Sequence, residues 1–267
     1  MRGLVLLISA LGGSLSAFAP SSVAQPLVYL RDIDPSIVQE MRYCGDHNFV
    51  GRSIRGYETD ECLLTERAAR ALKRVQEKLS KQGLSLKVYD CYRPVRAVMD
   101  FVQWAKRPGE ETTKGEFYPE IDKSQLFALK YISSRSAHSR GSTVDLTVVS
   151  KREQPIPQNP QPGYSRGQPL QACHLPVGQR FPDNSLDFGT GYDCFHALSH
   201  TDNPKIVGQA RGHRRLLVAE MEREGFRNYP REWWHFTLKN EPFPGTHFDS
   251  PIRPHKDRPE ARCTPKR

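Results

Sequence analysis

Apolar side chains recur at helical spacing in the segment LLTERAARALKRVQEKLSKQG, residues 63–83. The stripe consists of Ala68, Leu72, Val75 and Leu79. This i, i+4, i+7, i+11 spacing places all four side chains on one face of a helix. Thr65 is suited to cap the N-terminus, and Gly83 is suited to end the helix. The pattern therefore predicts an amphipathic helix with this stripe against the core.

Two further helices and three strands are predicted in the same way. Alternating apolar residues predict strands over 84–90 and 143–149, and EWWHFTLKN predicts an aromatic strand over 232–240. Apolar residues at helical spacing predict helices over Pro94–Ala105 and about 204–224. The first of these helices would carry its proline at the first helical position, where proline is tolerated.

The order of these elements lacks a regular β-α-β alternation, which favours an α+β fold. We expect a single domain over residues 25–252, with a central sheet flanked by helices. Residues 151–185 are rich in Pro, Gln and Gly and predict an irregular surface insertion. Residues 253–267 predict a basic C-terminal tail that is loosely held.

The first residues are typical of a secretory signal peptide. Arg2 supplies the positive start, residues 4–11 the short apolar run, and Ser22-Val23-Ala24 a cleavage site of small residues. We expect cleavage after Ala24, which predicts a secreted or periplasmic protein with a signal peptide over residues 1–24. The apolar run is too short for a bilayer, and no later segment has the roughly 18 apolar residues of a membrane helix.

The cysteine content bears on disulfides and on metal binding. Six cysteines would form disulfides in an oxidising compartment. We expect the pairs Cys173–Cys194, which flank one irregular stretch, and Cys44–Cys62. None of the cysteines lies in a C-x-x-C pair, which argues against a cysteine-bound zinc cluster.

The formal net charge is +9, but basic residues are scattered among acidic ones. No nucleic-acid-binding motif and no interleaving of aromatic with basic residues appears. The charge therefore favours attraction to an anionic envelope, or simple solubility, over nucleic-acid binding.

Two short clusters supply the residue types of a catalytic metal site. His138 and Asp145 lie in SRSAHSRGSTVDLTVV, and His235 lies in EWWHF. Two imidazoles and a carboxylate suit a catalytic Zn²⁺ with one position left for water. Glu232 could then take the proton of that water, and Arg93 could stabilise a developing oxyanion.

These residues also have ordinary explanations. A single histidine is more often hydrogen-bonded or on the surface than a ligand, and Asp145 could be an ion-paired carboxylate with Arg93 as its partner. Residues three apart on a strand point to opposite faces, so Glu232 must lie at a bend before the strand to share a site with His235. The residues alone leave the metal site and the structural explanation both open.

Longer stretches carry a resemblance to a known family. SRSAHSRGSTVDLT, DCYRPVRAV and EWWHF are similar to the zinc D-alanyl-D-alanine dipeptidases, and LDFGTGYDCFHALSH resembles the M-G-x-x-F-D-F…S-H segment of that family. The similarity covers roughly residues 30–252, with the motifs in the family's order. It implies an α+β fold on a central, mostly antiparallel sheet.

The resemblance also implies a role for each site residue. His138, Asp145 and His235 match the ligands of one zinc ion, Glu232 the general base, and Arg93 the residue that stabilises the transition state. The positions that hold a small dipeptide are matched by Tyr43, Ser136 and Asp193. Asp193 is suited to pair with the free ammonium group of the substrate, which would favour a dipeptide over a longer chain.

The function that follows is zinc-dependent hydrolysis of D-Ala-D-Ala in cell-wall peptide turnover or salvage, with a small D,D-dipeptide as the partner and neither nucleic acid nor stable membrane insertion. Two alternatives stay open. A D,D- or L,D-carboxypeptidase that trims longer peptidoglycan peptides would need a pocket open at the substrate's amino side. A non-catalytic, zinc-stabilised wall-binding module would need neither Glu232 nor Arg93.

Overall fold

The computed structural model describes residues 26–152, 170–260 and 263. The expected signal peptide, and residues 153–169 of the expected insertion, lie outside this range. The helices and 3-10 turns are α1 (Leu30–Ile33), η1 (Arg42–Cys44), α2 (Glu66–Ser80), α3 (Val95–Lys106), α4 (Lys114–Phe117), η2 (Lys123–Gln125), η3 (Ala137–Arg140), η4 (Ala197–Ser199) and α5 (Gly208–Arg223). The strands are β1 (Val28–Tyr29), β2 (Val38–Gln39), β3 (Leu63–Leu64), β4 (Leu84–Asp90), β5 (Thr143–Ser150), β6 (Phe226–Tyr229) and β7 (Glu232–Leu238).

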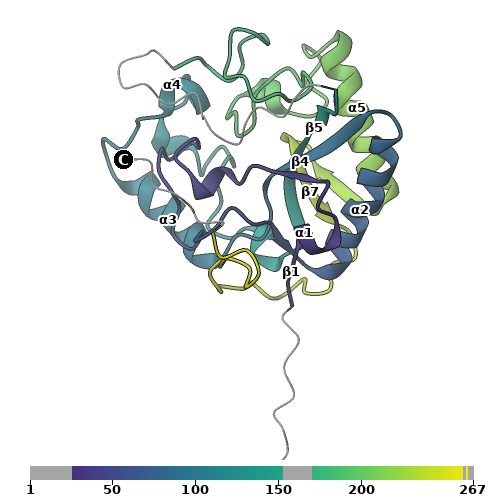
Figure 1. Ribbon diagram of the computed structural model, residues 1–267. Coiled ribbons are helices and arrows are strands. Elements are labelled where there is room, and N and C mark those ends of the chain that lie inside the picture. The colour runs from purple at the N-terminus through teal and green to yellow at the C-terminus, as the bar shows by residue number, and fades with distance from the viewer. Residues whose placement is uncertain (1–25, 153–169, 261–262, 264–267) are drawn as a thin grey trace, which may run out of the picture.

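A five-stranded mixed sheet forms the centre of the molecule (Figure 1), with strand order β2-β4-β5-β7-β6. The edge strand β2 runs parallel to β4, and the other neighbouring pairs are antiparallel. Strands β1 and β3 form a separate antiparallel pair. The α+β class is therefore confirmed, and the parallel edge strand makes the sheet mixed.

The helix and strand predicted over residues 63–90 are confirmed. Helix α2 begins directly after Thr65, and its predicted stripe is fully buried because it packs on the sheet. Strand β4 covers the whole predicted segment 84–90. Strands β5 and β7 likewise form where alternation and aromatic content predict them.

The predicted starts of the other two helices are wrong. Pro94 precedes α3 as its N-cap residue, because its ψ of 152° is extended and Val95 is the first helical residue. Helix α5 starts at Gly208 instead of residue 204, because residues 204–207 form a turn that ends in the extended Val207.

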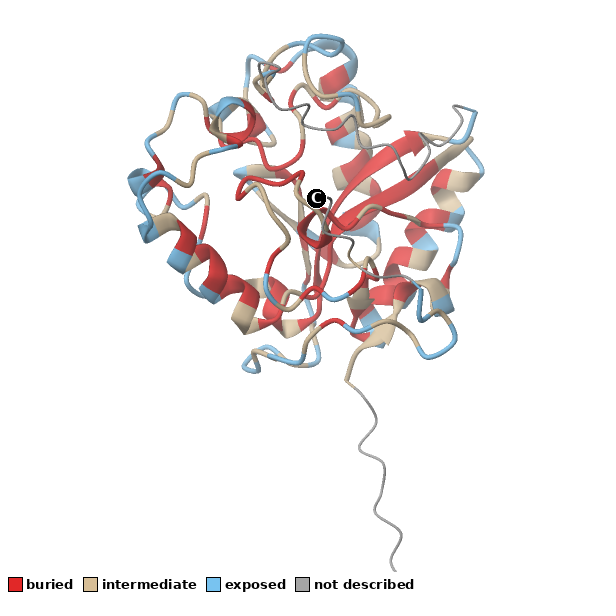
Figure 2. Ribbon diagram, turned by 60° about the vertical axis from the view of Figure 1, so that its left-hand side comes forward, coloured by how far each residue is buried: buried red, intermediate tan, exposed pale blue. Residues whose placement is uncertain are grey.

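Two apolar clusters fill the molecule, and the central strands are buried almost throughout (Figure 2). In the first cluster, α2 and α5 pack on one side of the sheet. In the second, residues around α3 pack together on the other side (Figure 1). Its large aromatic members include Phe49, Phe101, Trp104, Tyr118 and Phe195. The candidate site lies where these clusters meet.

Three disulfides join segments that are far apart in the chain. Cys173 pairs with Cys194 as predicted. The predicted Cys44–Cys62 pair is wrong, since the structure pairs Cys44 with Cys263 and Cys62 with Cys91. The reason is tertiary: β3 runs beside the end of β4, where Tyr92 N–H donates to the Leu63 carbonyl over 2.9 Å, so Cys62 faces Cys91.

The C-terminal tail is held more firmly than its composition predicts. Besides the Cys263 disulfide, Arg258 pairs with the buried Glu61 over 3.0 Å and with Asp32 over 2.9 Å. Tyr29 donates a hydrogen bond to the Arg253 carbonyl over 3.1 Å. These contacts attach the tail, through Arg253 and Arg258, to β1, to α1 and to the residues just before β3.

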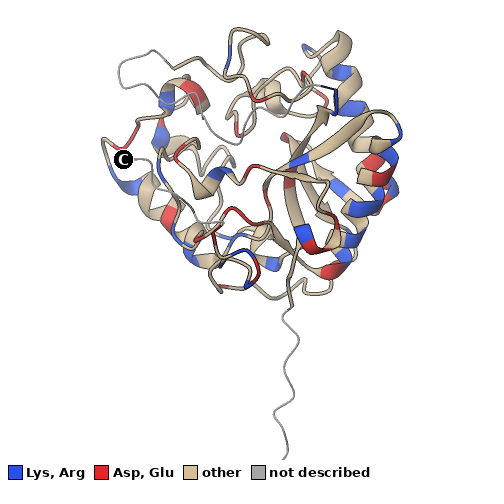
Figure 3. Cartoon of the chain, in the orientation of Figure 1, with Lys and Arg blue, Asp and Glu red and all other residues tan. Residues whose placement is uncertain are grey.

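Charged residues of both signs alternate over the surface, as on α2 (Figure 3). Several form pairs, such as Arg70 with Glu66 and Lys78 with Glu224. The described residues include no helix that is both long and apolar enough to cross a bilayer.

Candidate active site

Three potential metal ligands converge in the centre of the molecule. His138 Nε2 lies 3.3 Å from Asp145 Oδ1, His235 Nδ1 lies 3.0 Å from the same oxygen, and the two nitrogens are 3.3 Å apart. Asp145 on β5 lies directly opposite His235 on β7, so the sheet register itself brings these two residues together. The residues that the sequence singled out as a ligand set thus form one cluster that could hold a metal ion.

The third member, His138, is brought to the cluster by a short turn. Ser136 caps η3 by accepting the His138 N–H over 3.2 Å, and Gly141 ends η3 with a left-handed φ of 76°. Glycine is favoured there because a side chain is strained at this φ, and a Cβ would also press on the Leu27 side chain. His138 Nδ1 lies 2.7 Å from the Cys91 carbonyl. That carbonyl can only accept, so the proton sits on Nδ1 and Nε2 is free for a ligand.

The donor set fits a small divalent cation. Ligand atoms held about 2.0 Å from a tetrahedral ion lie about 3.3 Å apart, close to the observed separations. Asp145 Oδ1 is buried and has no hydrogen-bond partner in the described chain, which is costly unless a cation neutralises it. Burial alone would raise the pKa of Asp145, but His138 and His235 hold it well below its usual range. Burial also lowers the pKa of His235 and favours the neutral ligand form.

Glu232 reaches the cluster despite its spacing of three from His235. It is the first residue of β7, not a residue before the strand as the alternation argument required. The β6–β7 pairing shifts register between Asn228 and Tyr229, and this bulge turns the strand end so that Glu232 Oε2 lies 3.6 Å from His235 Nδ1. Burial raises the pKa of Glu232 well above its ordinary value, and the neighbouring carboxylates raise it further.

Arg93 lies at the same site, fixed by a carboxylate. Its Nε and Nη2 donate to Asp90 Oδ2 over 2.9 and 2.7 Å, and Tyr57 donates to the other Asp90 oxygen over 2.6 Å. The guanidinium lies over the rings of Tyr43 and Phe101, about 5 Å from each centroid. Asp90 is opposite Asp145 in the sheet, so Arg93 also offsets the repulsion between two adjacent carboxylates.

Tyr43 and Asp193 form a second buried pair beside the cluster. Tyr43 on η1 donates to Asp193 Oδ2 over 2.6 Å. Asp193 has a left-handed φ of 53° and lies next to the Cys173–Cys194 disulfide. Burial raises the pKa of Asp193 to about 7, and the charge of Asp145 adds to this effect. A cationic group placed beside this carboxylate would stabilise its ionised form.

Glu120, His174 and His196 also approach one another, outside this site. Leu198 N–H donates to His196 Nδ1 over 3.1 Å, so the proton of a neutral His196 sits on Nε2, which faces Glu120 at 3.3 Å. The two imidazoles stack with an interplanar angle of 16°, so their in-plane lone pairs run nearly parallel. This geometry fits a hydrogen-bonded histidine–glutamate cluster better than a metal site.

Two partners of the site were not singled out from the sequence. Asp90 stands in the quoted DCYRP stretch, and its place at the end of a strand just before Arg93 was a usable signal. Tyr192 donates to Asp145 Oδ2 over 3.1 Å. It stands in the quoted LDFGTGYDCFHALSH stretch directly before Asp193, which was a usable signal, although an aromatic residue there also fits a core position.

Comparison with known proteins shows the family of the chain. The sequence profile described as D-ala-D-ala dipeptidase matches residues 23–158 and 151–253. The D-alanyl-D-alanine dipeptidase of Enterococcus faecium is 32% identical over 225 residues, which is 84% of this chain and 97% of that protein. The enzyme of the same name from Streptomyces coelicolor is 33% identical over 224 residues, 84% of this chain and 96% of its own. The one from Escherichia coli is 29% identical over 212 residues, 79% and 84% of the two chains.

These similarities define the class of the protein as a metallopeptidase, and the cluster of potential metal ligands is compatible with it. Within that class, the chain belongs to the D-Ala-D-Ala dipeptidase family. The family resemblance inferred from the quoted motifs is confirmed.

Proposed function

We propose that this enzyme is a zinc-dependent dipeptidase that hydrolyses D-Ala-D-Ala. The observation that carries the proposal is the cluster of His138, Asp145 and His235, in which a buried Asp145 oxygen faces both imidazoles, with Glu232 just outside the ligand set. Two nitrogen donors and one carboxylate oxygen suit Zn²⁺. The metal ion would supply a Lewis acid for the scissile carbonyl and would acidify a water molecule.

The chain's own residues carry the proton transfers. Glu232 is the general base, because it lies 3.6 Å from a ligand atom and is not itself in the ligand set. It takes the proton of the attacking water and returns it to the leaving amine. Arg93 stabilises the oxyanion, since Asp90 holds its guanidinium rigidly and on the same side of the sheet as Asp145.

The buried pair beside the cluster recognises the substrate's amino end. Asp193 accepts the ammonium group, and Tyr43 orients the carboxylate through its 2.6 Å hydrogen bond. Ser136, already a cap for the His138 turn, is the third residue that we propose to contact the dipeptide. A free α-ammonium group is found only at a peptide's first residue, and in a longer chain the residue before the scissile bond has an amide N–H instead. This arrangement therefore favours a dipeptide over a longer chain.

We also propose that the enzyme is exported and acts in cell-wall peptide turnover or salvage. Residues 1–24 would be the signal peptide, residues 25–252 the catalytic domain with an insertion over 151–185, and residues 253–267 a tail. The three disulfides are compatible with an oxidising compartment and support this placement.

The decisive experiment measures release of free D-alanine by the zinc-loaded mature chain. Substrates are D-Ala-D-Ala and a pentapeptide that ends in D-Ala-D-Ala. We expect cleavage of the dipeptide alone. The variant Glu232→Ala should retain zinc and lose about 10²- to 10⁴-fold in turnover, the usual contribution of a general base.

Glu222→Ala, the same substitution at an exposed position on α5, is the matched control and should behave as wild type. Cleavage of the pentapeptide would replace the proposal with a carboxypeptidase. Zinc binding without any cleavage would replace it with a binding module, and loss of zinc in Glu232→Ala would make Glu232 a ligand.

A further inference from the structure

The ring of Tyr192 is fixed between the strands that flank Asp145. It is buried and stacks on Tyr89 of β4, with 4.4 Å between ring centroids and an interplanar angle of 18°. It meets Trp234 of β7 edge-on at 5.5 Å. Strands β4 and β7 lie on either side of β5, which carries Asp145. Packing from both neighbouring strands therefore sets the position of the Tyr192 hydroxyl.

That hydroxyl faces two groups of the candidate site. It lies 3.1 Å from Asp145 Oδ2 and 3.4 Å from the Tyr43 hydroxyl oxygen. A phenol has one proton to donate, and the carboxylate is both nearer and the stronger acceptor. Tyr43 gives its own proton to Asp193. The Tyr192 proton therefore goes to Asp145. The Tyr43 hydroxyl lies next to that of Tyr192 and donates to Asp193, so it connects the candidate metal cluster with the proposed ammonium-binding carboxylate.

The two oxygens of Asp145 consequently have different surroundings. Oδ1 faces His138 and His235 and has no hydrogen-bond partner in the described chain, whereas Oδ2 accepts from Tyr192. Without the phenol, the carboxylate could rotate about its terminal bond, because such sp³–sp² torsions are broad. Arg93 alone is a weak restraint, with Nη2 3.7 Å from Oδ2.

We propose that Tyr192 is a positioning residue that fixes the carboxylate of Asp145, so that Oδ1 is presented to the metal before the metal arrives. This inference rests on the proposed metal site and adds a residue to it. Hydrogen-bond partners of metal ligands typically contribute 10- to 100-fold to metal affinity.

Tyr192→Phe removes the donor and keeps the ring.

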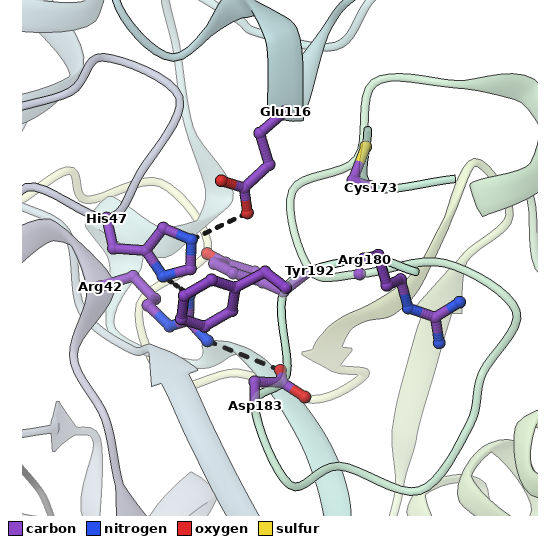
Figure 4. A pocket seen from close by; sticks show the side chains of 9 residues that line it. Arg42, His47, Glu116, Cys173, Arg180, Asp183 and Tyr192 are labelled. Carbon is purple, nitrogen blue, oxygen red and sulfur yellow. Dashed lines mark hydrogen bonds and ion pairs between the residues drawn. The ribbon is translucent and has the colours of Figure 1, made fainter. Parts of the chain in front are cut away.

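Tyr89 offers the matched control. Its ring stacks on Tyr192, but its own hydroxyl bonds Asp183 and Ser185, away from the metal cluster. Figure 4 shows Tyr192 and Asp183 in the wall of a small pocket that Arg42, His47 and Glu116 also line. Tyr89→Phe therefore deletes a buried hydroxyl from the same aromatic stack and leaves the bond to Asp145 intact.

The experiment compares the metal-free mature wild type, Tyr192→Phe and Tyr89→Phe. Zinc affinity is measured by competition with a chromogenic chelator, and the visible spectrum of bound Co²⁺ reports ligand geometry. We expect Tyr192→Phe to raise the zinc Kd about tenfold or more and to alter the Co²⁺ bands. Tyr89→Phe should change neither. Thermal unfolding of the metal-free proteins shows whether either variant has merely loosened the fold.

Equal zinc affinity and equal Co²⁺ spectra in wild type and Tyr192→Phe would overturn the inference. The same loss of affinity in Tyr89→Phe would also overturn it, since the stack and not the hydrogen bond would then be responsible. A wild-type chain that binds no zinc would instead defeat the proposed function. These readouts need no substrate, so they do not depend on which peptide is cleaved.

Discussion

Three buried carboxylates of the site differ in their affinity for protons because their neighbours differ. Asp145 faces two imidazoles, which hold its pKa well below the usual range despite burial. For Glu232 and Asp193 burial is the dominant effect and raises the pKa of both, in Asp193 to about 7. Carboxylates whose pKa values are pushed apart can serve as ligand, base and countercharge in one small site. The residue types were legible in the sequence, but their proton affinities depend on the neighbours.

The pKa of Asp193 predicts the pH dependence of substrate binding. Only the ionised carboxylate attracts an ammonium group, and a pKa of about 7 leaves Asp193 mostly protonated at pH 6 and mostly ionised at pH 8. We expect kcat/KM for D-Ala-D-Ala to rise with pH from 6 to about 7.5, chiefly through a falling KM, and to level off above that as the substrate's own α-amino group, with a pKa of about 8, loses its proton. The measurement is a pH profile of both constants for the zinc-loaded enzyme.

Asp193→Asn is the isosteric control for that profile. It cannot ionise, so its KM should be high and should not fall between pH 6 and pH 8. A variant that kept the wild-type pH profile of KM would show that another group titrates and that Asp193 does not hold the ammonium.

Local irregularities of the elements place the chemistry. The bulge between β6 and β7 brings Glu232 to the face of His235, and the left-handed Gly141 returns the chain from η3 into β5. Strand β4 ends at Asp90, and the Cys62–Cys91 disulfide fixes the next residue. Because the Cys91 carbonyl holds His138 Nδ1, this disulfide also supports a proposed metal ligand.

We predict two effects of the double substitution Cys62→Ala/Cys91→Ala. The disulfide spans 29 residues, so its loss should lower the free energy of unfolding by roughly 3–4 kcal/mol on chain-entropy grounds. Without the disulfide, the Cys91 carbonyl is held less firmly and orients the His138 ring less well, which should also weaken zinc binding. Urea unfolding and chelator competition measure the two effects separately.

A second double substitution, Cys44→Ala/Cys263→Ala, separates the effect on stability from the effect on zinc binding. That disulfide spans 219 residues and has no contact with His138, so it should affect stability without a comparable loss of zinc affinity. Equal zinc losses in both double variants would mean that general loosening, and not the carbonyl, governs the affinity.

In the whole molecule, the candidate active site lies between two apolar clusters. The cluster of α2 and α5 holds one side of the sheet, and the aromatic cluster around α3 holds the other. Tyr192 belongs to the first cluster and Tyr43 to the second, and their hydroxyl oxygens are 3.4 Å apart. The disulfides tie distant segments to this arrangement, among them the tail through Cys263.

The proposed export is tested on the full-length chain. In a bacterial host with a periplasm, we expect the protein to be recovered there with Gln25 as its first residue and with its cysteines oxidised. N-terminal sequencing and thiol titration of the fractionated cells give the answer. Recovery of an intact Met1 chain from the cytoplasm would contradict both the processing site and the placement.

The sequence by itself determined the local elements and the chemical inventory. Periodicity placed α2, β4, β5 and β7, because one-sided burial imposes a period of 3.6 or 2 on a segment whatever its partners. The motifs likewise indicated the family and the residues proposed as metal ligands. Only the tertiary structure decided that Cys62 pairs with Cys91, that a bulge brings Glu232 to His235, and that Tyr192 reaches Asp145. These contacts join residues far apart in the chain or depend on a shift in strand pairing, and no local pattern encodes which distant segments become neighbours.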